Sequence, residues 1–371
     1  MQAAVFDRQT DKKRLYFIDL LESIAIFFVL SYHGTNYSYG FLQDRGNVLF
    51  YFRYYLRTIL SCCVPLFFFA NGYLLLNRQF SLKKHIRKII RLVILTYIWG
   101  TIDLFILMFI KNEFFSVKDF LIGVWTWKQG WINHLWYMQV LVIIYLFFPL
   151  IKTAYDNNRN AFYFFTIVVA LFTFGNTALN LSASIAVHVI WGKNNFYSVN
   201  WFNGFNPFLG IYGYYSIVYF CVGGIADDLL EKLPFFKNTW VCIVTILISM
   251  FAQFVIGVVL SNIINSSWDV VWNGYDTIFA LINVVCIYSL CTKYKGKNDL
   301  FRTAVILVSS NTLGIYFVHV LFNQMFIPYI KDVAIMSNIP GNILYTFVIL
   351  LISLGTVLII KKMPLLKRLV M

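Results

Sequence analysis

The chain has 371 residues, of which 60% are hydrophobic and only 12% are charged. A soluble domain carries about 25% charged residues, so this composition excludes a protein whose only solvent is water. The formal net charge of +14 would suit a nucleic-acid binder. The basic residues are distributed differently, as described below, and we expect no nucleic-acid partner.

Long apolar runs follow one another along the chain with short gaps. A membrane-spanning helix needs about 20 mostly apolar residues. Ten runs qualify, at about 15–33, 57–76, 89–110, 134–151, 160–180, 207–226, 239–260, 276–292, 303–327 and 342–361. The sequence therefore predicts an all-α, polytopic integral membrane protein with about ten transmembrane helices. It forms one membrane domain over residues 1–371.

The lysines and arginines predict the orientation, because cytoplasmic loops carry an excess of them. With the N-terminus inside, 22 of the 30 fall on the inner side and 8 on the outer side. This split predicts that both termini are cytoplasmic and accounts for the net charge as a topology signal. The longest outer loops are expected at about 34–56, 111–133 and 181–206. We expect a multi-pass protein of the plasma membrane.

The first span carries three ionisable residues, Asp19, Glu22 and His33. Such groups are costly inside a membrane, so each is a candidate for function. Glu22 and His33 are eleven residues apart, so they share a helix face and lie about 16 Å apart along the axis. The imidazole of His33 can accept a proton from a hydroxyl group at neutral pH. The alternative is an interfacial histidine that caps the span or bonds to a loop.

Other polar residues in or near the spans also have two interpretations. Asp103 and His319 lie within spans, and His319 fits either a site or a hydrogen-bonded packing histidine. His134 opens the fourth span beside Trp136 and Tyr137, a group that would also suit an aromatic belt. A basic run, residues 83–91, leads into the third span. It either reflects the cytoplasmic excess of basic residues or binds phosphate groups. The six cysteines fit neither a zinc site nor a disulfide framework, and we expect no metal.

Four stretches in chain order carry a recognisable pattern. They are residues 18–25 followed by His33, residues 64–74, residues 134–137 with Tyr145 and Pro149, and residues 313–319. Together they resemble the motifs of the membrane-bound acyltransferase 3 family, whose members acylate sugars of bacterial surface polysaccharides. Two residues depart from the family pattern. Glu22 stands where the family usually has Arg or Lys, and Asn71 stands where it usually has Ser.

The resemblance implies a membrane-bound O-acyltransferase that uses cytoplasmic acyl-CoA, with acetyl-CoA as the default donor. The acceptor would be a hydroxyl of a cell-surface or cell-wall polysaccharide or of a lipid-linked glycan. His33 would act as general base or transient acyl carrier, with Asp19 and Glu22 on the same catalytic stripe. The implied acyl-CoA-binding residues are Arg14, Asn71, Tyr73, Arg87, Lys88 and Arg91. The implied acceptor-side residues are His134, Trp136, Tyr137 and His319.

Two other functions fit the same composition. One is a transporter, flippase or polymerase of lipid-linked glycans, although such proteins more often show charged residues deep in many spans and an internal repeat. The other is a sensor or assembly subunit without catalysis. The sequence leaves the acyl group and the acceptor open. It also leaves open the oligomeric state, with a homodimer among the alternatives, and the effect of Glu22.

Overall fold

The computed structural model describes residues 14–34, 47–202, 213–294, 299–330 and 338–370. Over these ranges the chain forms helices and turns without any strand. The α-helices are α1 (Tyr16–Gly34), α2 (Val48–Arg57), α3 (Cys63–Leu76), α4 (Leu82–Lys111), α5 (Val117–Trp125), α6 (Trp136–Asn157), α7 (Arg159–Trp191), α8 (Ser216–Gly224), α9 (Ala226–Lys232), α10 (Thr239–Ile264), α11 (Ile278–Lys293), α12 (Asp299–Ser309), α13 (Thr312–Ile330) and α14 (Ile339–Lys362).

The prediction of an all-α polytopic membrane protein is confirmed. Eight helical segments in the described part of the chain are long and apolar enough to cross a membrane. Two of the ten predicted spans correspond to helices that are shorter than predicted. The span at 276–292 is α11, with 16 residues, and the described part of the span at 207–226 contains α8, with 9 residues. The predicted span at 303–327 is interrupted, because α12 ends at Ser309 and α13 begins at Thr312.

Three predicted outer loops are partly helical, which corrects the sequence-based boundaries. The loop at 34–56 contains α2, and the loop at 111–133 contains α5. The first residues of the predicted loop at 181–206 belong to α7, which ends at Trp191. This helix has 33 residues and is therefore about 50 Å long. Because the hydrocarbon core is about 30 Å thick, α7 extends well beyond it.

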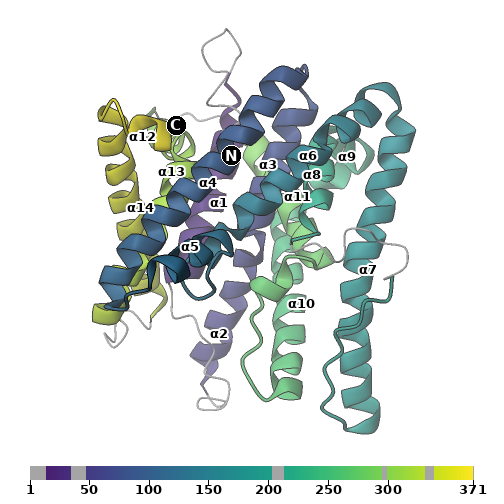
Figure 1. The fold of residues 1–371 in the computed structure, drawn as a ribbon. Helices are drawn as coiled ribbons and strands as arrows, with labels where there is room; N and C mark the ends of the chain where they lie inside the picture. The colour runs from purple at the N-terminus through teal and green to yellow at the C-terminus, as the bar shows by residue number, and fades with distance from the viewer. Residues whose placement is uncertain (1–13, 35–46, 203–212, 295–298, 331–337, 371) are drawn as a thin grey trace.

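Helix α1 lies at the centre of the bundle, as Figure 1 shows. It packs against α3, α11, α12, α13 and α14. Its apolar side chains Leu21, Ala25 and Ile26 are fully buried. The acidic residues of α1, Asp19 and Glu22, are buried as well, so neighbouring helices can supply their partners.

Helices α3 and α8 cross with their backbones in contact. A Cβ atom added at Gly72 would lie 1.8 Å from the carbonyl oxygen of Phe220. One added at Gly223 would lie 2.0 Å from the carbonyl oxygen of Phe69. Small residues at such a crossing allow close helix packing in membranes. This contact fixes α3, which carries part of the site described below.

The two ends of the described chain lie in the same half of the molecule (Figure 1), as an even number of crossings requires. We call this the inner end, in keeping with the predicted orientation, and the opposite one the outer end. The basic run before the third predicted span is not a loop. Residues 82–91 form the first turns of α4, so that Arg87, Lys88 and Arg91 are helical residues at the inner end.

Candidate active site

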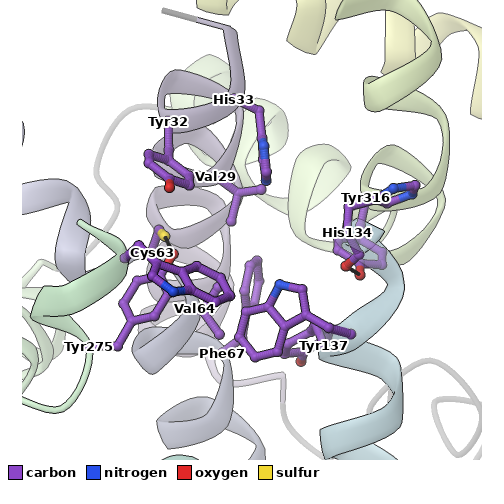
Figure 2. Close-up of a pocket in the computed structure, with 12 residues that line it drawn as sticks. Val29, Tyr32, His33, Cys63, Val64, Phe67, His134, Tyr137, Tyr275 and Tyr316 are labelled. Carbon is purple, nitrogen blue, oxygen red and sulfur yellow. Dashed lines mark hydrogen bonds between the residues drawn. The ribbon is translucent and has the colours of Figure 1, made fainter. Parts of the chain in front are cut away.

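A small pocket lies at the outer end of the bundle, where α1, α3, α6, α13 and the turn before α11 meet. Its volume is about 30 Å³, enough to admit water. Figure 2 shows His33 on one side of it and His134 with Tyr316 on the other. Its lining residues are Val29, Tyr32, His33, Cys63, Val64, Phe67, His134, Trp136, Tyr137, Trp272, Tyr275 and Tyr316.

The structure brings together three histidines from three different predicted spans. The ring centroids of His33 and His319 are 5.3 Å apart, and those of His134 and His319 are 6.3 Å apart. Nδ1 of His319 lies 2.6 Å from the carbonyl oxygen of Tyr316, so this nitrogen is the donor. Nε2 of His319 is buried and has no hydrogen-bond partner among the described residues. The cluster therefore offers imidazole nitrogens for proton transfer.

Asp103 on α4 is part of this cluster, although the sequence indicated only a buried acid of unknown role. The side chain is fully buried, and its Oδ2 atom lies 3.3 Å from Nε2 of His134. The backbone at His134 is held as well, because the hydroxyl of Tyr316 donates to its carbonyl oxygen at 2.5 Å. The acid was visible in the sequence, but its pairing with a histidine on another helix was not.

The turn between α10 and α11 also contributes to the pocket. Asp269 accepts a hydrogen bond from the Tyr32 hydroxyl at 2.7 Å and lies 3.4 Å from the Arg57 guanidinium. The same turn carries Trp272 and Tyr275 into the lining. Sequence reasoning missed both aromatic residues, because a tryptophan or tyrosine in an outer loop of a membrane protein is ordinary.

Trp136 and Tyr137, both predicted on the acceptor side, do line the pocket. The Trp136 ring meets Trp272 edge-on, with centroids 5.3 Å apart. Tyr137 is buried between Phe68 and Tyr316, at 4.9 Å and 5.5 Å between ring centroids. These rings give the pocket apolar walls, with the histidines as its main polar groups.

A second polar group lies deeper, toward the inner end. Nζ of Lys88 donates to the Tyr145 hydroxyl at 3.0 Å, and that hydroxyl donates to Oδ1 of Asn71 at 2.9 Å. Glu22 is buried nearby and attracts Lys88 electrostatically. Because α1 is one continuous helix, Glu22 stays about 16 Å from His33 along the axis. The predicted catalytic stripe is therefore divided between two separate sites.

The amide of Asn71 is fully buried, and both ends of it are engaged. Its oxygen accepts from Tyr145, and its nitrogen donates to the carbonyl oxygen of Phe67 at 2.9 Å. A role for Asn71 in acyl-CoA binding would thus require these bonds to open. In the described conformation it joins α3 to α6.

Asp19 and Arg14 form a contact at the inner end, far from the pocket. The guanidinium reaches both carboxylate oxygens of Asp19, at 2.5 Å and 2.8 Å. It also donates to the carbonyl oxygen of Ile306 and to the hydroxyls of Ser309 and Ser310, while Ser309 donates to Asp19 at 2.6 Å. These bonds attach the start of α1 to the interruption between α12 and α13. Asp19 lies about 21 Å from His33 along the axis, so it does not reach the pocket.

The other predicted donor-side residues also lie at the inner end. The Tyr73 hydroxyl donates to Asp227 at 3.0 Å, and the Arg91 guanidinium reaches the carbonyl oxygen of Arg368 at 3.5 Å. Arg87 is exposed. In the described part of the chain, no group of three or more His, Cys, Asp and Glu side chains is arranged to hold a metal ion.

Comparisons with known proteins bear on the chemistry of this site. An amino-acid racemase of Enterococcus faecalis is 22% identical over 302 residues, which cover 80% of this chain. Those residues cover only 38% of the racemase, so the chain corresponds to a minor part of that protein. No solved structure matches the chain.

The family comparison covers far more of the sequence. The model described as an acyltransferase domain, that of the acyltransferase 3 family, matches residues 15–361. The match runs from the start of α1 to the last turn of α14 and includes the three histidines of the cluster. The chain therefore belongs to the acyltransferase 3 family.

Proposed function

We propose that this acyltransferase moves an acyl group, by default acetyl, from acyl-CoA to a hydroxyl group of a polysaccharide or lipid-linked glycan. The acceptor belongs to the cell surface or cell wall, and the enzyme acts in the plasma membrane. The observation that carries this proposal is the histidine cluster at the outer end, with His33 and His319 5.3 Å apart between ring centroids. Family membership supports acyl transfer, and the cluster supplies the proton-transfer groups that the reaction needs.

In the proposed reaction His33 accepts the proton of the acceptor hydroxyl. The hydroxyl oxygen attacks the thioester carbonyl, a C–O bond forms, the C–S bond breaks, and the sulfur of coenzyme A takes up a separate proton to leave as the thiol. His33 is suited to this role because it lines the pocket and is exposed at the outer end of α1, where an acceptor arrives. A transient acyl-imidazole on the same ring is the covalent variant of this step.

The donor would enter from the inner end. Arg87, Lys88 and Arg91 place three basic side chains on the first turns of α4, and such groups bind phosphates. The extended arm of coenzyme A would then span the distance to His33. The pocket is small, at about 30 Å³, so an acyl group would have to move side chains of its lining, which includes Phe67 and Tyr137.

The test is acetyl transfer from labelled acetyl-CoA by purified protein carrying His33→Ala. We expect a loss of at least about 100-fold in turnover with acetyl-CoA binding retained, the usual effect of removing a general base. His188→Ala is the matched control, because His188 lies near the outer end of α7 and its side chain bonds to Asn194, away from the pocket. Ester groups on the surface glycan of cells with each variant give the second readout.

Two outcomes would contradict the proposal. Full turnover in the His33→Ala variant would remove the residue from the reaction. If wild-type protein neither binds nor consumes acetyl-CoA, while a labelled glycan crosses proteoliposome membranes with it, the transporter alternative is correct.

A further inference from the structure

The proposed role of His33 covers only one of the two proton transfers that acyl transfer from a thioester needs. The acceptor hydroxyl loses a proton, and the departing sulfur gains one. A single imidazole can serve both only by moving between the two atoms. The structure contains a second acid–base group beside the pocket that the proposed function does not use, namely Asp103 with His134.

The Asp103 carboxylate is an unusual group for its location. It is fully buried, and neither of its oxygens has a well-aligned hydrogen-bond donor among the described residues. An unpaired buried carboxylate costs several kcal/mol. Nε2 of His134, 3.3 Å from Oδ2, is the polar group that offsets this cost. Contacts between catalytic groups are often long before substrate binds and shorten in the complex.

The geometry leaves the other nitrogen of His134 available. Nε2 faces Asp103, while Nδ1 is buried without a hydrogen-bond partner among the described residues. The Tyr316 hydroxyl donates to the carbonyl oxygen of His134 and so anchors the backbone of this residue. With Nε2 turned to the carboxyl group, Nδ1 is the nitrogen of this ring that is left to exchange a proton.

We propose, on the basis of the function proposed above, that His134 is a second catalytic residue and that Asp103 is its positioning residue. The His134 imidazolium donates its Nδ1 proton to the sulfur as the C–S bond breaks. His33 takes the hydroxyl proton as the C–O bond forms. One proton is gained by His33 and one is lost by His134, so the products are the ester and the neutral thiol.

We infer that His319 carries a proton from His33 back to His134, which restores the starting protonation state of both rings. Its ring centroid is 5.3 Å from that of His33 and 6.3 Å from that of His134, so it is near both rings. Its Nδ1 is fixed on the Tyr316 carbonyl, which leaves Nε2 as the exchanging atom. The pocket has room for one water molecule to complete this path. The proton on His33 then returns to His134 after each turnover.

The test compares two donors with different leaving groups, water serving as acceptor. One is acetyl-CoA, and the other is the acetyl thioester of thiophenol, a more acidic thiol that leaves without needing a proton. Release of thiol is followed with purified protein for wild type, Asp103→Asn, Asp103→Glu and His134→Gln. Asp228→Asn is the control for loss of an aspartate charge, because Asp228 pairs with Arg159 at the inner end.

We expect Asp103→Asn to lower kcat with acetyl-CoA by about 10- to 100-fold, and with the phenyl thioester by less than about threefold. His134→Gln should show the same donor selectivity, and Asp103→Glu should recover part of the rate. Asp228→Asn should match wild type with both donors. If Asp103→Asn does not fold, as judged by its melting curve, His134→Gln decides the question.

Equal losses with the two donors, or no loss with either, would overturn the role of Asp103 and His134 and leave the proposed function intact. If the wild-type protein neither binds acetyl-CoA nor releases thiol from it, the proposed function fails, and this inference fails with it. The two failures are distinguishable because the first is read from the variants and the second from the wild type.

Discussion

The crossing of α3 and α8 allows one structural effect to be worked out in advance. In Gly72→Ala the new Cβ would lie 1.8 Å from the carbonyl oxygen of Phe220, more than 1 Å inside ordinary contact. The obstacle is backbone, so the two helices must separate. Overpacking of this kind costs about 3 kcal/mol, which lowers the ratio of folded to unfolded protein by roughly 100-fold. For a chain of 371 residues this corresponds to about 4 °C in melting temperature.

The assay is a melting curve of detergent-solubilised protein at a fixed scan rate. Gly355→Ala is the matched control, because a Cβ at that helical position meets nothing within 4 Å. Alanine is the better helix former, so the control should melt about 1 °C above wild type. Gly223→Ala should behave like Gly72→Ala, since its Cβ would lie 2.0 Å from the Phe69 carbonyl oxygen. If Gly72→Ala and Gly223→Ala both melt at the wild-type temperature, the close backbone contact between α3 and α8 is refuted.

Three further substitutions test other parts of the protein. Asp19→Asn weakens the bonds from Arg14 and Ser309, and it should cost about 2–3 kcal/mol and about 3 °C in melting temperature. Glu22→Gln removes the negative charge beside Lys88, and it should tighten acetyl-CoA binding about fivefold, roughly 1 kcal/mol, in an equilibrium binding assay. Tyr32→Phe frees the turn that carries Trp272 into the pocket, and it should lower thiol release from acetyl-CoA about fivefold.

Each of these has a control and a contrary result. Asp299→Asn, at an exposed position, should change the free energy of unfolding by no more than about 0.5 kcal/mol. If Asp19→Asn changes it as little, the contacts of Asp19 contribute little to stability. Weaker acetyl-CoA binding in Glu22→Gln would mean that Glu22 itself contacts the donor. Tyr329→Phe, at a largely exposed tyrosine, is the control for Tyr32→Phe, and equal rates in the two variants would exclude the turn from the reaction.

The sequence determined the class of fold and the list of ionisable groups, because both follow from composition. Apolar runs long enough to cross a membrane predict helices, and buried acids and imidazoles are rare enough to be noticed one by one. His33 was singled out in this way, and its helical register correctly separated it from Glu22. Hydropathy could not locate helix ends at the outer loops, where polar and aromatic residues continue α7 beyond the membrane.

The tertiary structure decided which of those groups meet. Asp103 lies on α4, His134 lies just before α6, and His319 lies on α13. Only the packing of these helices brings the three side chains close to His33. It likewise assigned Asp19 to a contact at the inner end, since its partner Ser309 is 290 positions away. A helix fixes the spacing of residues along its own axis. Contacts between helices depend on how their side chains and backbones fit together, and no single stretch of sequence contains that information.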